Sequence, residues 1–250
     1  RILAPQPFMK SILKKIFKSQ KELSNKDIIF IDLQKKLEIK KIFESISNYS
    51  DESELRFVGG CVRKILNNEE IDDIDLATNI DPENISKALK NNNIDFYETG
   101  IEHGTITAII NGQKFEITSL RKDILTDGRH AKVQFSKNWK DDASRRDFTI
   151  NAIYADIDGN LFDPFDGRQD IKDGKIIFIG DAGIRIKEDY LRILRYVRFF
   201  LNYSKIEHDK KIIKLIRQNI IGVRNLSKER LLDELKKLVL SNHFFKIANY

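Results

Sequence analysis

Two aspartates separated by one residue, Asp73 and Asp75, are the side chains of this sequence best suited to chemistry. We predict that they lie on one strand, where alternate side chains project from the same face, roughly 6–7 Å apart. Two carboxylates held side by side can bind one or two divalent metal ions. Earlier in the chain, Gly59 and Gly60 precede a short helix, where glycines let backbone N–H groups approach a phosphate. Metal and phosphate together suggest a site for nucleotidyl transfer.

A third carboxylate usually completes a two-metal site, and Glu116 is the candidate here. In the segment KFEITS, Phe115 and Ile117 are expected to face the core, which puts Glu116 on the opposite face of its strand. A strand next to that of the aspartates would bring Glu116 beside them. Taken alone, each feature has a plain structural explanation, as a turn, a solvated loop or an exposed strand face. Their order and their co-occurrence favour the chemical interpretation.

The composition excludes several classes of protein. The 250 residues are 41% hydrophobic and 33% charged, which is typical of a folded protein with a heavily charged surface. A single cysteine excludes a disulfide framework, and four scattered histidines lack metal-ligand spacing, so we expect a reducing, cytoplasm-like compartment. No apolar run reaches the ~18–20 residues that span a membrane. The basic amphipathic start lacks the apolar region of a secretory signal.

Charge divides the sequence into two parts. Residues 176–250 hold 16 Lys and Arg against 8 Asp and Glu, whereas residues 1–175 hold 28 against 30. A near-neutral first part and a basic second part suggest catalysis in the first part and polyanion binding in the second. Lys-rich helices, however, often have no role beyond exposing a charged face to solvent. The sequence starts without methionine and stops directly after a helical pattern, so we expect the natural chain to extend further.

The elements that must position these residues follow an α+β order. Helical periodicity runs through residues 1–50. The following segments are predicted as a strand (54–58), a helix (61–66), a polar loop (67–72) and the strand of the aspartates (73–77).

Turn and cap signals predict the elements beyond that strand. Asp81-Pro82 opens a helix, with Asp81 as its N-cap. A strand (IDFYETG) follows, and Asn111-Gly112 then separates two alternating segments as a hairpin. Residues 121–144 show little periodicity and many charges, which predicts a long loop. The segments beyond it are predicted as regular structure over 145–155, a hairpin at Asp158-Gly159, and helices from Ala182 onward with Ser227 as an N-cap.

The ordered motifs resemble the class II nucleotidyltransferases, the family of bacterial tRNA CCA-adding enzymes and their poly(A) polymerase relatives. The motifs are GGCVR, DID, HGTITAII with FEITSLR, DGRH, RRDFTINA, DPFDGRQD, EDYLRILR and KERLLDEL, and they cover roughly residues 54–240 in the family's order. The resemblance implies a palm-like nucleotidyltransferase head built on a small mixed sheet, followed by an all-helical neck. The predicted divisions are an N-terminal helical segment (1–50), a catalytic head (51–175), and a neck with the start of a body (176–250).

The same resemblance implies roles for the matching residues. Two Mg²⁺ ions, or Mn²⁺ in their place, would be held by Asp73, Asp75 and Glu116. The triphosphate and ribose would be bound by Gly59, Gly60, Arg63, Arg145, Arg146, Asp147 and Asn151. The incoming base would be read by Glu188, Asp189, Arg192 and Arg195, with Glu229 and Arg230 as support. A flexible loop would contain Arg121, Asp127, Gly128 and Arg129. Two positions depart from the family: Asp166 stands where glycine is frequent, and Ala131 where proline is common.

The helix predicted to carry Asp189 and Arg192 offers a physical means of choosing a base. The two residues are three apart and would therefore share a helix face. A guanidinium donates two parallel N–H groups and a carboxylate accepts, so together they mimic a Watson–Crick partner for cytosine or adenine. Both bases present an amino donor and a ring-nitrogen acceptor, a pattern that uracil and guanine reverse. The simpler alternative is a surface pair between Glu188 and Arg192, worth roughly 0.2–0.5 kcal/mol.

Three functions remain open on this reasoning. The first is template-independent addition of CCA to tRNA 3′ ends from CTP and ATP, and the stretch YETGIEHGTITAII resembles the tRNA enzymes. The second is poly(A) synthesis on general RNA 3′ ends. The third is an RNA-binding module that has lost catalysis, which the intact aspartate pair and glycine turn argue against.

Overall fold

The structure, a computed structural model, describes residues 25–126, 131–241 and 243–249. Its head is built on a seven-stranded mixed sheet of order β3-β4-β5-β2-β1-β8-β9. Strands β2 and β5 pair in parallel and the other neighbours are antiparallel. The strands are β1 Leu55–Val58, β2 Asp75–Thr78, β3 Asp95–Gly100, β4 Thr105–Ile110, β5 Gln113–Ser119, β8 Tyr154–Ala155 and β9 Leu161–Phe162. The predicted α+β fold is confirmed.

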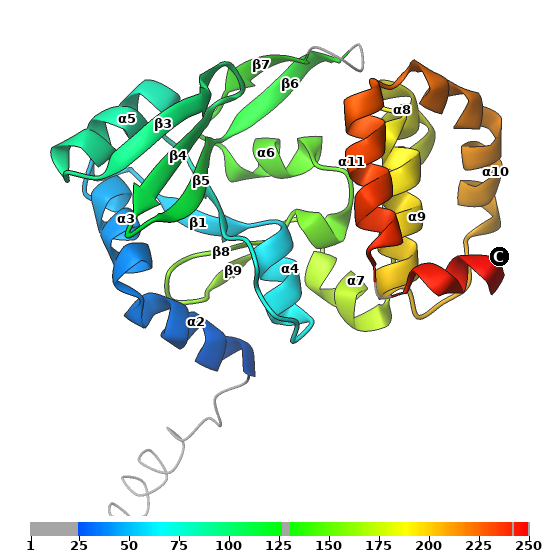
Figure 1. Cartoon of the computed structure of the whole chain (residues 1–250), viewed down its shortest axis with the longest axis horizontal. Helices are drawn as coiled ribbons and strands as arrows, with labels where there is room; N and C mark the ends of the chain where they lie inside the picture. Colours follow the sequence, from blue (N-terminus) through cyan, green and yellow to red (C-terminus); the bar gives the residue numbers. More distant parts are fainter. Residues whose placement is uncertain (1–24, 127–130, 242, 250) are drawn as a thin grey trace, which may run out of the picture.

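Helices cover both faces of this sheet and then form a separate group (Figure 1). In the head, the helices and 3₁₀ turns are α2 Asn25–Lys35, α3 Leu37–Ser47, α4 Gly60–Leu66, α5 Pro82–Asn91, η1 Ile101–His103, α6 Trp139–Arg145, η2 Thr149–Asn151 and α7 Gly167–Asp173. The neck consists of α8 Ala182–Glu188, α9 Leu191–Tyr203, α10 Lys210–Asn219, η3 Ile220–Asn225, α11 Lys228–Val239 and η4 Phe244–Asn249. Among the residues described, no helix is long and apolar enough to cross a membrane.

The main core lies between one face of the sheet and helices α2, α3, α4 and α5. Phe30 of α2, Phe43 of α3 and Phe57 of β1 are all buried there, and their rings pack together. The described part of the predicted N-terminal segment therefore packs on the head. The other face holds a smaller cluster that includes Trp139 of α6 and Tyr154 of β8. Alternation along β2 and β5 directs apolar side chains to the main core and leaves the intervening ones for the α6 side.

Head and neck share a third core. Phe148 and Ile150, from the segment after α6, are buried with Phe178, Tyr196 and Phe199 of the neck side. The Phe148 ring lies 4.8 Å from that of Phe178 and 5.5 Å from that of Phe199. This apolar contact fixes the neck helices against the segment that carries the RRD motif. The domain boundaries themselves remain predictions.

One turn signal and two N-cap positions are confirmed, although one of the caps makes no hydrogen bond. The hairpin between β4 and β5 turns at Asn111-Gly112, where φ is positive at both residues, +53° and +77°. Ser227 caps α11, since its hydroxyl accepts from the backbone N–H of Arg230 at 3.4 Å. Asp81 occupies the N-cap position of α5, but its side chain makes no capping hydrogen bond.

The predicted long loop over 121–144 is wrong. Strands β6 Arg121–Thr126 and β7 Ala131–Phe135 form an antiparallel ribbon, and helix α6 follows. Charged residues fill the first half of β6 (RKDILT), and the alternation of β7 (AKVQF) covers only five residues in a highly charged stretch, so neither stood out as a strand. The two strands form backbone hydrogen bonds with each other, and this pairing is not predicted by the local sequence of either strand. The predicted loop residues Asp127, Gly128 and Arg129 lie outside the described residues.

Two site residues lie off the elements predicted for them. Strand β2 begins at Asp75, so Asp73 lies in the segment that precedes the strand rather than on it. Asp189 interrupts the predicted neck helix, because its backbone is extended (φ −153°, ψ 105°) and separates α8 from α9. Helical periodicity runs through this break, which explains why the sequence pattern predicted one continuous helix.

Candidate active site

Two acidic side chains meet where β2 begins. Parallel pairing of β2 with β5 places Asp75 directly opposite Glu116, as the strand argument predicted, and neighbouring strands lie about 4.8 Å apart. Phe115 and Ile117 are buried in the main core, so Glu116 is exposed on the other face, also as predicted. Asp73 is exposed just before the strand. We call Asp73, Asp75 and Glu116 the carboxylate edge.

The electrostatics of the carboxylate edge fit a bound cation. Burial raises the pKa of Asp75, the nearby charges of Glu116 and Asp73 raise it further, and Arg146 and Arg63 only partly offset them. A divalent ion among these oxygens would relieve that repulsion, and carboxylates are the ligands Mg²⁺ prefers. In the described part of the chain, no three His, Cys, Asp or Glu side chains are already gathered closely enough to hold a metal ion. The edge thus supplies suitable donors without being a pre-assembled cage.

A glycine turn opens beside the carboxylate edge. Gly59 has φ +69°, a conformation that side chains other than glycine rarely adopt, and it leads directly into α4. A Cβ on Gly59 would come within 3.5 Å of Nη1 of Arg146. At this turn, backbone that no side chain covers therefore lies close to one guanidinium nitrogen. This combination can bind phosphate oxygens.

A buried aspartate that the sequence reasoning missed holds that guanidinium. Asp142 of α6 is 1% exposed and accepts from Arg145 (2.8 Å to Nε), from Arg146 (3.0 Å to Nη2) and from the Tyr154 hydroxyl (2.7 Å). Burial opposes its ionisation, but Arg146 and Arg145 outweigh burial and hold the pKa of Asp142 far below its usual range. Its position three and four residues before the two arginines was the signal in the sequence.

A second buried aspartate ties the head to the neck. Asp147 accepts from Nε of Arg195 at 2.6 Å, from Asn151 at 2.9 Å and from the backbone N–H of Phe148 at 2.8 Å. Burial alone would raise its pKa, but Arg195 and Asn151 lower it. Asn151 in turn accepts from Nη1 of Arg63. We call Asp142, Asp147 and the arginines that they bind the arginine junction.

Arg63 is a framework residue in this structure. It is 7% exposed, and its guanidinium lies 4.8 Å from the ring centre of Phe199 and 5.0 Å from that of Tyr203. Both rings belong to α9, so Arg63 joins α4 to the neck. The same α9 reaches α11 through Glu234, a buried residue that accepts from Arg198 at 2.6 Å. Sequence reasoning did not select Glu234.

The predicted base-reading residues are brought together around the break between α8 and α9. Asp189 pairs with Arg230 of α11 at 2.7 Å, and it accepts from the backbone N–H of Leu191 at 3.1 Å. Arg192 pairs with Glu188 at 2.7 Å, and this pair is mostly buried, not the surface pair of the simpler alternative. The prediction that Asp189 and Arg192 share one helix face is wrong, because Asp189 lies before α9.

Arg185 is a further residue that sequence reasoning missed. Its Nη2 donates to the backbone carbonyl oxygens of Arg145 and Arg146, at 2.6 and 2.7 Å, and its Nη1 pairs with Glu188 at 2.6 Å. Its own carbonyl oxygen accepts from Arg192 at 2.6 Å. Arg185 therefore connects the end of α6 with the predicted base-reading residues.

The remaining predicted residues lie nearby on defined elements. Arg121 begins β6, and its guanidinium donates to the carbonyl oxygen of His103. Burial, with Arg145 nearby, lowers the pKa of Arg121 to about 10. Glu229 is exposed in the first turn of α11, whereas its neighbour Arg230 holds Asp189.

Comparison with known proteins identifies this combination of head and neck. Residues 55–177 match the Poly A polymerase head domain. The chain is 45% identical over 196 residues to CCA tRNA nucleotidyltransferase 1, mitochondrial, of Homo sapiens, covering 76% of this chain and 44% of that protein. It is 41% identical over 194 residues to the CCA-adding enzyme of Leuconostoc citreum (strain KM20), covering 76% and 46%. The chain thus spans about half the length of the curated relatives it matches.

Solved structures agree with this assignment. The CCA-adding enzyme of Bacillus stearothermophilus in complex with CTP superposes with a TM-score of 0.73 at 30% identity, over 85% of this chain and 51% of that chain. A tRNA nucleotidyltransferase complexed with a primer tRNA and an incoming ATP analog gives 0.67 at 26% identity, over 83% and 58%. The chain thus carries a head domain of the poly(A) polymerase type, and its head and neck together are similar to those of tRNA CCA-adding enzymes.

Proposed function

We propose that this protein adds C and A nucleotides from CTP and ATP to the 3′ end of tRNA without a template. The observation that carries the proposal is the pairing of Asp75 with Glu116 beside the glycine turn, where Arg146 presents Nη1. A carboxylate pair and a phosphate-binding turn are what nucleotide transfer from a triphosphate requires. The similarity to proteins named CCA-adding enzymes supports tRNA as the acceptor.

The metal ions in this proposal are two Mg²⁺, or Mn²⁺, held by Asp73, Asp75 and Glu116. When bound, such ions stabilise the attacking and leaving oxygens of a phosphoryl transfer. The chain's own part is to hold the carboxylates: β5 fixes Glu116 beside Asp75 through the parallel ladder. Asp73, on the segment before β2, is free to turn toward an ion because it is exposed.

The triphosphate would lie over the glycine turn. Gly59 and Gly60 leave the backbone open, and Arg146 and Arg145 are held by Asp142 with their guanidinium groups already oriented. Preorganised donors bind developing charge without reorganising during the reaction. In this proposal Arg63, Asp147 and Asn151 act through the framework of hydrogen bonds that they form with one another and with Arg195.

Base choice in this proposal belongs to Glu188, Asp189, Arg192 and Arg195. A carboxylate beside a guanidinium can bind the Watson–Crick side of cytosine or adenine. The carboxylate accepts a hydrogen bond from the amino group of the base, and the guanidinium donates one to the ring nitrogen. The carboxylate of Asp189 is held by Arg230, and Arg192 is held by Glu188 and by the Arg185 carbonyl oxygen. Reading a base therefore requires these side chains to exchange at least one present partner for the nucleotide.

One assay separates this function from its alternatives. The protein is incubated with a tRNA that lacks its terminal CCA, with Mg²⁺ and with single labelled nucleotides, and the products are sized. CTP-dependent addition of two residues followed by one A is the expected result. A long ATP-dependent ladder on any RNA would instead establish poly(A) synthesis, the second candidate. Binding of RNA with no incorporation would favour a module without catalysis.

The proposal also includes a reducing, cytoplasm-like compartment. Cys61 is a buried free thiol, and burial raises its pKa to about 11, so it remains a protonated core residue at neutral pH. Some relatives carry the name mitochondrial. Subcellular fractionation with an antibody to the protein tests the cytoplasmic assignment, and recovery in an organelle fraction would contradict it.

A further inference from the structure

A basic pocket lies at the opposite end of α4 from the glycine turn. The helix has seven residues, so its ends are about 10 Å apart. The pocket has a volume of about 650 Å³, and its lining includes four cations: Lys26, Arg168, Lys172 and Lys205. Four carboxamide and three apolar side chains complete the lining, and no carboxylate is among them. None of the residues assigned to catalysis or base choice lines this pocket, so it is a separate site.

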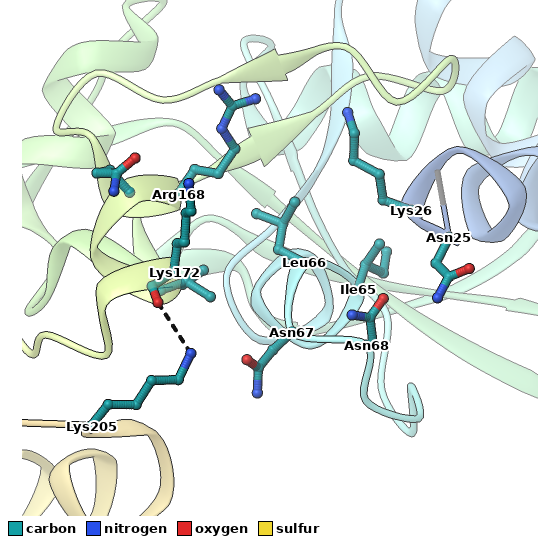
Figure 2. Close-up of a pocket in the computed structure, with 11 residues that line it drawn as sticks. Asn25, Lys26, Ile65, Leu66, Asn67, Asn68, Arg168, Lys172 and Lys205 are labelled. Carbon is teal, nitrogen blue, oxygen red and sulfur yellow. Dashed lines mark hydrogen bonds between the residues drawn. The ribbon is translucent and has the colours of Figure 1, made fainter. Parts of the chain in front are cut away.

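Three different parts of the chain supply the cations. Figure 2 shows Arg168, Lys172 and Lys205 on one side of the pocket and Lys26 on the other, with Leu66 of α4 between them. Arg168 and Lys172 are on α7, Lys205 follows α9, and Lys26 is on α2. Elements distant in sequence thus converge with charges of one sign on a single pocket. Such convergence raises the local positive potential beyond that of isolated surface lysines.

The two cations of α7 form no close ion pair in the described part of the chain, and Lys172 only helps to lower the pKa of its neighbour Asp173. Arg168 and Lys172 are four residues apart, and like charges at this spacing destabilise a helix. Both are exposed, and no described side chain forms an ion pair with either. Lys26 is 3.5 Å from Asp27, and the Lys205 ammonium donates to the Lys172 carbonyl oxygen at 3.1 Å. The lining of the pocket therefore carries net positive charge that a bound anion would neutralise.

Three acidic side chains near the pocket are occupied by other partners. Glu69 accepts from Asn67 and from the Tyr203 hydroxyl. Asp163 accepts from the backbone N–H groups of Gly167 and Arg168, both at 2.8 Å. Asp173 accepts from Gln169 and Lys175. These three carboxylates thus order the chain around the pocket and do not line it.

The floor of the pocket is apolar and firmly supported. Ile65 is buried in the main core, and Leu66 and Ile171 pack against the same core. A volume of about 650 Å³ exceeds what one phosphate group needs, and a strand of RNA offers phosphates together with sugars that can lie on an apolar floor. We propose that this pocket binds the phosphate groups of an RNA strand, outside the active site. Phosphate as the ligand follows from the pocket itself, whereas RNA as its source rests on the proposed function.

The test compares two charge-reversed variants with the same change in net charge. Arg168→Glu with Lys172→Glu alters the pocket, and Lys87→Glu with Lys90→Glu alters exposed positions on α5. Binding of a labelled tRNA that lacks CCA is measured by fluorescence anisotropy at several salt concentrations. Loss of two phosphate contacts should weaken binding about tenfold and lower the salt slope by about 2. The α5 variant should bind like the parent chain. CTP incorporation at saturating RNA should be unchanged, with a higher KM for RNA.

Further measurements distinguish RNA from other phosphate ligands and test whether the variants are folded. Arg168→Gln with Lys172→Gln should show a smaller shift in the same direction, and thermal unfolding should match the parent chain. Inorganic pyrophosphate is titrated without divalent metal. Loss of pyrophosphate binding with unchanged RNA binding would overturn RNA as the ligand, and unchanged binding of both would overturn the pocket altogether. RNA binding that depends on the pocket in a protein that incorporates no CTP would contradict the proposed function and support the pocket.

Discussion

The carboxylate edge and the arginine junction hold the same kinds of side chain in opposite electrostatic conditions. At the edge, burial and two neighbouring carboxylates raise the pKa of Asp75. At the junction, the arginines around Asp142 and Asp147 lower the pKa of each, although both are buried. A carboxylate with lowered pKa has found its partners within the protein, whereas one with raised pKa lacks them. The difference separates a region built to hold its shape from one built to receive a cation.

The junction also explains how the edge can be left incomplete. Asp142 holds Arg145 and Arg146 by ion pairs of 2.7 and 3.0 Å, and Arg185 binds the carbonyl oxygens of the same two residues. These contacts fix the backbone and guanidinium groups that border the glycine turn. Because the junction is stable, the protein can fold although the repulsion among the carboxylates of the edge is not relieved.

The largest effect is expected at the edge. Asp75→Ala or Asp73→Ala should abolish nucleotide incorporation, by more than about 100-fold, because even outer-shell partners of a metal are worth 10–100-fold. The midpoint of thermal unfolding should not fall, since either change removes a like charge. Asp72→Ala, a neighbouring exposed aspartate paired with Lys64, is the matched control and should keep its activity. Retained incorporation by the Asp75 variant would refute its role with the metals.

The opposite result is expected at the junction. Asp142→Ala leaves two guanidinium groups partly buried without their carboxylate, which should lower the free energy of unfolding by about 3–5 kcal/mol. Urea unfolding followed by circular dichroism measures this change. A loss below about 1 kcal/mol would mean that solvent replaces Asp142 and that the junction is not a structural anchor.

Much of the edge followed from sequence, whereas at the junction the sequence named every residue except Asp142 but none of the ion pairs among them. The period of KFEITS and the glycine in Asn111-Gly112 are local signals, and together they placed Glu116 correctly beside Asp75. The partners of Asp142 and Asp147 come from several elements, and the spacing that links Asp142 to Arg145 and Arg146 does not show that Asp142, rather than Asp141, is buried. The break at Asp189 was hidden because apolar periodicity continues through it. Long-range packing, which decides such cases, leaves no trace in local propensity.

A change in nucleotide selectivity should distinguish the proposed base-reading residues from the arginine junction. Asp189→Ala should relax the preference for CTP and ATP over UTP and GTP by about 10–100-fold, the discrimination expected of one bidentate pair. Arg230→Ala should do the same more weakly, because it frees Asp189 without removing it. Single-nucleotide incorporation assays measure both. Unchanged preference in the Asp189 variant would show that the base is read elsewhere.

The pH dependence of stability gives a finer test of the junction. The pKa of Asp147 is lowered in the folded state, so its contribution is fully present above the unfolded pKa of about 3.9 and is lost as pH falls through the folded value. Asp147→Asn should cost about 2 kcal/mol at pH 7, and this deficit should shrink below pH 4. Urea unfolding between pH 7 and pH 3 measures the difference. A deficit that stays constant would assign the loss to shape, not to charge.

The smallest effect is expected at an aspartate in neither region. Asp166 is exposed and precedes α7 with φ +56°, the left-handed conformation in which side chains other than glycine are strained. The φ value gives a physical reason to expect that glycine would suit this position better. Asp166→Gly removes the strain but gives the unfolded chain more freedom, so a net gain of about 0.5 kcal/mol is expected in urea unfolding. Asp166→Ala is the control and should lose stability, because it removes the charge and keeps the strain. If the glycine variant also loses stability, the carboxylate itself contributes at this position, and charge then matters even where the backbone sets the conformation.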